Sequence, residues 1–218
     1  MKITVSPFST DVNLGVVYKE PMLGLAQEEL RLPLVREILN SFECRLDDLK
    51  FDANHLSGKY IQFSKYYGRS LFSLQFGLEE TSASIFKVEK TELAFDICEK
   101  LSTILDEIPI GSTRLNISRH FTSKEDINSF LKSLNPTISE DLRNAVVGRG
   151  VFYNLQFPDI KLNVFVTVVN SLLARNGLFF GMENQFLSQP ESLKKSAEVV
   201  LEKHDFILQA LGITLEEG

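Results

Sequence analysis

The alternation of apolar and polar residues predicts a chain of short strands and amphipathic helices. A strand is expected at 11–18, and Pro33 is well placed to open a helix that runs to Phe42. Beyond this helix the apolar period becomes two, as in strands with one buried face. Four antiparallel strands are predicted, at 44–52, 59–67, 69–77 and 82–88. Thr91 can then cap a helix whose apolar residues recur at helical spacing to Ile108.

The second half of the chain repeats this order of elements. A strand is expected at 113–121, and Ser123 with Asp126 resembles a capping box that begins a helix. A further short helix is predicted from Ser139. Three strands follow, at 150–157, 160–170 and 178–186.

Turn and cap signals define the end of the chain most sharply. The dipeptide Asn176-Gly177 predicts a tight hairpin turn between the last two strands. A capping box over 188–191 begins the final helix, and Gly212 is placed to end it. Leu201 and Ile207 belong to the apolar stripe of this helix, which should cover a sheet.

These elements predict an α+β fold made of two β-α-β(3-4)-α halves, 1–112 and 113–218, packed as one globular body. Each half should have an antiparallel sheet covered by a long amphipathic helix, and the two sheets can join into one. Gly68–Phe76 and 148–157 share a glycine-arginine turn followed by a similar strand sequence. This echo suggests an internal duplication, with a chance match as the alternative.

Two resemblances to known families accompany this layout. The element order resembles the duplicated fold of TATA-box-binding proteins. The segments 32–39, 202–208 and 213–216 resemble an uncharacterised, sporadically distributed bacterial family. That family implies no activity and supplies no site residue.

Composition and charge narrow the classes of function. The chain has 218 residues and a formal net charge of −6, so it should repel polyanions as a whole. It has neither a membrane-spanning apolar run nor a signal peptide, which favours a cytoplasmic protein without a membrane partner. The widely separated Cys44 and Cys98 fit reduced thiols.

No familiar catalytic motif is present, which favours a protein that is not an enzyme and needs no cofactor or metal. His204, on the apolar stripe of the last helix, fits a hydrogen-bonded core histidine better than a ligand. Asp96 and Glu99 flank Cys98 and should raise its thiol pKa. Asp47, Asp48, Asp52 and His55 form the nearest approach to a metal cluster, but a solvated turn is the favoured interpretation.

The surface that stands out combines basic and aromatic residues. Lys59, Tyr66, Arg69 and Arg149 are the predicted binding residues. For the surface as a whole, the favoured interpretation is that Phe63, Phe72 and Phe76 are core and the nearby charges, Lys65 included, are solvated, rather than that the strands stack single-stranded nucleic acid.

The favoured function is a non-enzymatic binding or interaction module whose exposed sheet face contacts a protein or peptide. One alternative is a small-ligand protein or enzyme with a pocket between sheet and helices. A second is a single-stranded nucleic-acid binder, which the acidic net charge disfavours. A homo-oligomer is left open.

Overall fold

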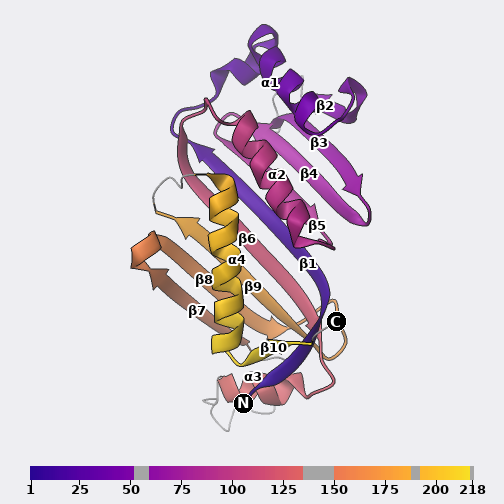
Figure 1. Ribbon diagram of the computed structural model, residues 1–218, viewed down its shortest axis with the longest axis vertical. Helices are drawn as coiled ribbons and strands as arrows, with labels where there is room; N and C mark the ends of the chain where they lie inside the picture. The colour runs from indigo at the N-terminus through magenta and orange to yellow at the C-terminus, as the bar shows by residue number, and fades with distance from the viewer. Residues whose placement is uncertain (52–58, 135–149, 188–191, 217–218) are drawn as a thin grey trace, which may run out of the picture. The chain divides into compact units, whose positions relative to one another are not determined.

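The computed structural model describes residues 1–51, 59–134, 150–187 and 192–216 and confirms the α+β class (Figure 1). The predicted helix from Ser139 and the capping box at 188–191 lie outside these residues. Within the described part of the chain, no helix is both long and apolar enough to cross a membrane.

The chain forms two compact units, each made of separate segments. Unit 1 comprises 1–10, 116–184 and 199–218, whereas unit 2 comprises 11–115 and 185–198. Strands β1 (Ile3–Tyr18) and β6 (Ile110–Thr122) therefore contribute residues to both units. The predicted boundary after residue 112 falls within β6, close to the point where this strand passes from unit 2 to unit 1.

Unit 2 contains an antiparallel meander that ends against β1. Its strand order is β2-β3-β4-β5-β1-β6. The first four are β2 (Leu49–Phe51), β3 (Lys59–Tyr67), β4 (Ser70–Gly77) and β5 (Glu80–Phe86). Helices α1 (Glu28–Ser41) and α2 (Thr91–Ile104) accompany this sheet, and α2 lies across one of its faces (Figure 1).

The core of unit 2 is rich in phenylalanine. Just beyond the end of α1, Phe42 places its ring 5.7 Å from that of Phe63 and 5.0 Å from that of Phe72. Phe63, Phe72 and Phe76 are all buried, which confirms their predicted place in the core. The rings are offset or tilted, an arrangement that aromatic pairs prefer.

Three local predictions in unit 2 are wrong. Helix α1 begins at Glu28, so Pro33 lies inside the helix and does not open it. Proline has no N–H group, so the carbonyl one turn earlier lacks its helical partner; Pro33 is exposed, so water can bond to this carbonyl instead. Lys90, not Thr91, occupies the cap position of α2 and makes no side-chain cap bond. The strand expected at 44–52 shortens to β2, because a 3-10 turn occupies Leu46–Asp48.

Unit 1 has the strand order β7-β8-β9-β6-β1. Strands β7 (Gly150–Phe157), β8 (Leu162–Asn170) and β9 (Gly177–Phe186) match the sequence prediction closely. A strand that was not predicted, β10 (Ile213–Leu215), pairs in parallel with the start of β1. Helix α3 (Ile127–Leu134) contacts β7 and β8, and the part of α4 (Leu193–Ala210) that belongs to this unit buries its apolar stripe.

Two turns in unit 1 differ from their predicted form. Asp126, not Ser123, caps α3, because its carboxylate accepts bonds from the Asn128 amide at 3.0 Å and the Ser129 hydroxyl at 2.6 Å. Asn176 and Gly177 do not form a two-residue hairpin; β8 and β9 are joined by residues 171–176, with Asn176 at φ 48°. The predicted end of α4 is confirmed, since Gly212 follows it at φ 77°.

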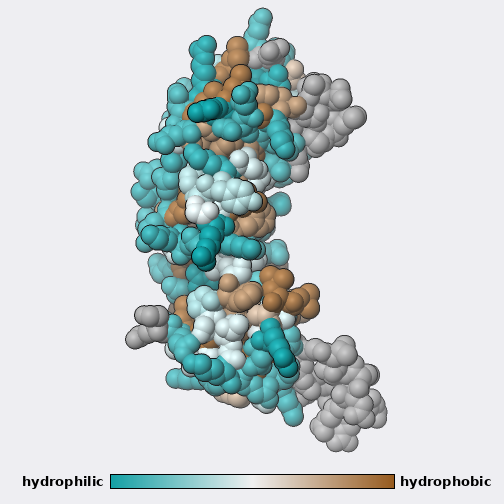
Figure 2. Space-filling model, turned by 90° about the vertical axis from the view of Figure 1, so that its right-hand side faces the viewer, coloured by the Kyte–Doolittle hydropathy of each residue, from teal (hydrophilic) through white to brown (hydrophobic). Residues whose placement is uncertain are grey.

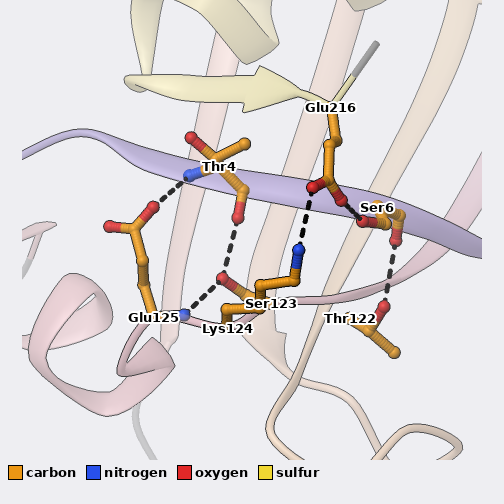
Figure 3. Close-up of polar contacts among 7 residues, drawn as sticks. All are labelled: Thr4, Ser6, Thr122, Ser123, Lys124, Glu125 and Glu216. Atoms are coloured by element: carbon orange, nitrogen blue, oxygen red, sulfur yellow. Dashed lines mark hydrogen bonds and ion pairs between the residues drawn. The ribbon is translucent and has the colours of Figure 1, made fainter. Parts of the chain in front are cut away.

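A polar network ties both ends of the chain to the turn after β6 (Figure 3). The Thr4 amide donates to Glu125 Oε1 at 2.9 Å, and the Ser123 hydroxyl donates to the Thr4 carbonyl at 2.7 Å. Glu216, just after β10, accepts from the Ser6 hydroxyl and pairs with Lys124 Nζ at 3.2 Å. The strand β10 is thus held by side chains as well as by its backbone pairing.

The sequence echo occupies two strands that are not equivalent in topology. It falls on β4, which has a neighbour on both sides, and on β7, which pairs only with β8 among the described strands. In the meanders that precede α2 and α4, β7 corresponds in order to β3, not to β4. The echo therefore does not support duplication, which stays a prediction.

Truncating the buried stripe of α4 is expected to destabilise the protein. Ile207 is 3% exposed, so Ile207→Ala should lower the free energy of unfolding by about 2–5 kcal/mol. Leu201 is only half-buried, contrary to the prediction, and Leu201→Ala should cost less. Urea denaturation measures both, with the exposed Phe206→Ala as control. A loss below about 0.5 kcal/mol for Ile207→Ala would place this residue at the surface.

Candidate functional site

Two of the predicted binding residues, Tyr66 and Arg69, are exposed in unit 2. Tyr66 is 69% exposed and lies opposite Leu71 in the ladder, on the face away from the phenylalanine core. Arg69 lies in the turn between β3 and β4, where its Nε is 3.8 Å from the Glu89 carboxylate. Because both side chains are largely exposed, this pair adds little stability, but it offsets the charge of Arg69.

Lys65 does not belong to the open face on which Tyr66 lies. Lys65 lies on the covered face, where its Nζ donates to the carbonyls of Phe42 and Glu43 at 2.8 and 3.3 Å, just beyond α1. Such carbonyls carry the negative end of the helix dipole, so Lys65 serves the fold. Lys59 pairs with Gly77 in the ladder, and Arg149 lies outside the described residues. Binding by Lys59, Tyr66, Arg69 and Arg149 remains a prediction.

The open face of unit 2 has one row of small polar side chains and one row of larger apolar and aromatic side chains. Cross-strand partners share a face of the sheet. Ser64 pairs with Ser73, which pairs with Ser84, which pairs with Asn13. The same face also carries Tyr66, Leu71 and Phe86, which lie side by side across β3, β4 and β5; Tyr66 is 69% exposed and Phe86 is 40% exposed.

The open face of unit 1 carries three phenylalanine side chains, Phe152, Phe165 and Phe179. We call it the phenylalanine face and define it by Phe152 and Asn154 of β7, Phe165 and Thr167 of β8, and Phe179 and Gly181 of β9. Phe152 is 75% exposed and Phe165 is 45% exposed. In the ladder, Phe152 lies opposite Thr167 and Asn154 opposite Phe165.

A glycine lets one of these rings lie flat along its strand. A Cβ atom on Gly181 would stand 3.0 Å from two ring atoms of Phe179, so any larger residue would displace this ring. The Phe179 ring also lies close to the ring of His120, and the two ring centroids are 4.9 Å apart. His120 Nδ1 lies 2.8 Å from the Ser171 hydroxyl, which connects Phe179 to the loop after β8.

That loop presents further apolar side chains. Leu172 is 98% exposed and Leu173 is 61% exposed. The Ser171 hydroxyl accepts hydrogen bonds from the Leu173 and Ala174 amides at 3.1 and 3.0 Å, which orders the loop. Figure 2 shows one side of the surface, where hydrophilic residues predominate and hydrophobic residues form separate patches.

The phenylalanine face carries little charge. Strands β7, β8 and β9 contain one charged residue, Glu183, and otherwise only apolar, hydroxyl and amide side chains. The surface can therefore stack on rings or apolar groups and exchange hydrogen bonds, but it has no cation of its own for a phosphate.

Two other candidate residues from the sequence, Cys98 and Asp48, have structural roles. Burial raises the pKa of Cys98 to about 12, so this thiol is unreactive; desolvation, rather than the expected flanking acids, is the cause. Asp48 accepts a bond from the Arg45 amide at 2.7 Å, whereas Asp52 and His55 lie outside the described residues. No group of acids, histidines and cysteines in the described segments could hold a metal ion.

A buried histidine, His204, lies on α4 in unit 1 beside the exposed Asp205. His204 is fully buried, as predicted; its Nδ1 lies 2.9 Å from Asp205 Oδ1, and its ring meets the edge or face of Phe180 at 5.1 Å. Burial lowers the pKa of His204, and the nearby positive charge of Arg119 lowers it further, against the effect of Asp205. His204 is therefore neutral in the fold at neutral pH and has no access to a substrate in solution.

Comparison with known proteins adds no assignment. No protein-family model matches the chain, and no curated protein matches it. The resemblance to a bacterial family stays a prediction.

The phenylalanine face was missed by sequence reasoning, although a signal for it existed. In β8, Phe165 alternates in phase with Asn163 and Thr167, and in β7 Phe152 is in phase with Asn154. A phenylalanine in phase with polar residues lies on the open face.

The neutral, buried state of His204 predicts a dependence of stability on pH. The pKa of His204 in the folded protein lies below its ordinary value of 6.5. As the pH falls, His204 is therefore protonated in the unfolded chain at a higher pH than in the folded protein. The free energy of unfolding should decrease from about pH 7 to about pH 5. Urea denaturation across this range should show a weaker decrease for His204→Gln than for wild type. Equal slopes for His204→Gln and wild type would contradict this origin.

Proposed function

We propose that the protein is a non-enzymatic, cytoplasmic interaction module that holds a protein or peptide segment against the phenylalanine face. The observation that carries this proposal is the exposure of Phe152 and Phe165 on an open, almost uncharged sheet face. Exposed aromatic residues gathered on one surface are characteristic of interaction sites, because burying them on binding is favourable.

The chemistry of the surface favours a protein segment over a nucleic acid. Asn154 and Thr167, beside the rings, can exchange hydrogen bonds with a polypeptide backbone. Single-stranded nucleic acids also stack on aromatic rings of open sheets, which makes them the second candidate. Their phosphates need cations, however, and the three strands of this face supply only the acid Glu183. The alternative of a small ligand between sheet and helices stays a prediction.

Removing the two most exposed rings should abolish partner binding and leave the fold intact. Phe152→Ala with Phe165→Ala is expected to weaken binding at least tenfold, a loss of about 1.4 kcal/mol or more. Unfolding by urea should change little, because Phe152 is 75% exposed. A photoreactive phenylalanine analogue at position 152, introduced in the native cells, identifies the partner, whose affinity is then measured by calorimetry.

The matched control is Phe206→Ala, which removes a phenylalanine that is 57% exposed on α4 instead of on the sheet. It should bind like wild type. Equal affinity for wild type and the double variant would reject the phenylalanine face. A labelled single-stranded oligonucleotide, titrated at low and high salt, tests the second candidate: binding that weakens steeply with salt and vanishes in the double variant would replace the protein partner.

A further inference from the structure

The edges of a sheet expose unpaired backbone groups, and this protein protects its edges unequally. In unit 2 the outer strand β2 carries Lys50. The neighbouring strand β3 shifts register between Lys59 and Ile61, and the Arg31 guanidinium lies 5.3 Å from the ring of Phe51. Lysine and irregular pairing are features that prevent strands from pairing at an edge.

The outer strand of unit 1 has none of these protections. Strand β7 is eight residues long, and its sequence GVFYNLQF contains neither a charge nor a proline. Its pairing with β8 runs without a shift from Gly150↔Val169 to Phe157↔Leu162. Among the strands that the structure describes, β7 pairs with β8 alone.

The covered face of this strand is also incomplete. On β8 the residues opposite, Leu162, Val164 and Val166, are at most 1% exposed. On β7 their partners Phe157, Leu155 and Tyr153 are only half-buried. An apolar row that ends half-covered gains burial if another apolar row is added beside it.

We propose that β7 pairs with β7 of a second copy of this chain, in antiparallel orientation about a two-fold axis. Two copies of β7 are compatible for two reasons. The strand is uncharged, so two copies do not repel one another at the edge, and each copy adds an apolar row beside the half-buried row of the other. In the register centred on Asn154, Tyr153 of each copy lies opposite Leu155 of the other. Residues opposite one another share a face, so the two phenylalanine faces lie on the same side of the joined sheet.

This pairing is independent of the proposed function, because it uses the backbone edge of β7 and needs no other protein. Sedimentation velocity of the full chain, from about 1 μM to about 1 mM, should show a reversible monomer–dimer equilibrium. Asn154→Lys and Asn154→Asp should each raise the dissociation constant at least tenfold, because like charges then face one another. Mixing the two variants should restore dimers, because opposite charges face one another.

The control is Ser73→Lys, the same change from a neutral residue to a cation on β4, whose two edges are already paired. It should dimerise like wild type. Circular dichroism checks that each variant is folded. A wild type that stays monomeric at every concentration would overturn the proposal, and so would dimers that both Asn154 variants leave unchanged.

Discussion

Each unit of this protein is organised by one constraint: helices cover a single face of its sheet, and the opposite face remains in contact with solvent. Side chains alternate between the faces of a strand, so every strand contributes one row to each side. In unit 2 the covered row includes Phe63 and Phe72, and in unit 1 it includes Val164 and Val166. Burial of these rows supplies the main driving force for folding. What a partner can reach is therefore the other face and the edges.

Charge is distributed so that the surfaces left over are mostly neutral. Several cations are taken up by nearby acceptors: Lys65 by carbonyls beyond α1, Lys194 by Glu99 at 3.0 Å, and Lys100 by Asp96 at 2.9 Å. Exposed pairs of this kind contribute little stability each. Their consequence is a lower local charge on α2 and α4 in a chain of net charge −6. Strands β7, β8 and β9 carry little charge of their own, and this makes the phenylalanine face better suited to polypeptides than to phosphates.

In unit 1 the exposed rings and the open edge meet on one strand. Phe152 projects from β7 on the open face, while the backbone of the same strand is unpaired along one side among the described strands. Half-buried Tyr153 and Leu155 lie on its covered face. Strand β7 thus has incomplete contacts on its open face, on its covered face and along one edge. Charged side chains usually prevent pairing at such an edge, and β7 has none.

The sequence by itself determined the α+β class, most strand positions and the buried phenylalanines, because alternation and helical spacing are local properties that directly reflect which side is covered. The same alternation already placed Phe165 among polar neighbours. Only the tertiary structure decided that Lys65 turns toward the end of α1, that β10 pairs with β1, and that Arg119 lies near His204. These features join residues far apart in the chain, and no local pattern specifies which distant groups will meet.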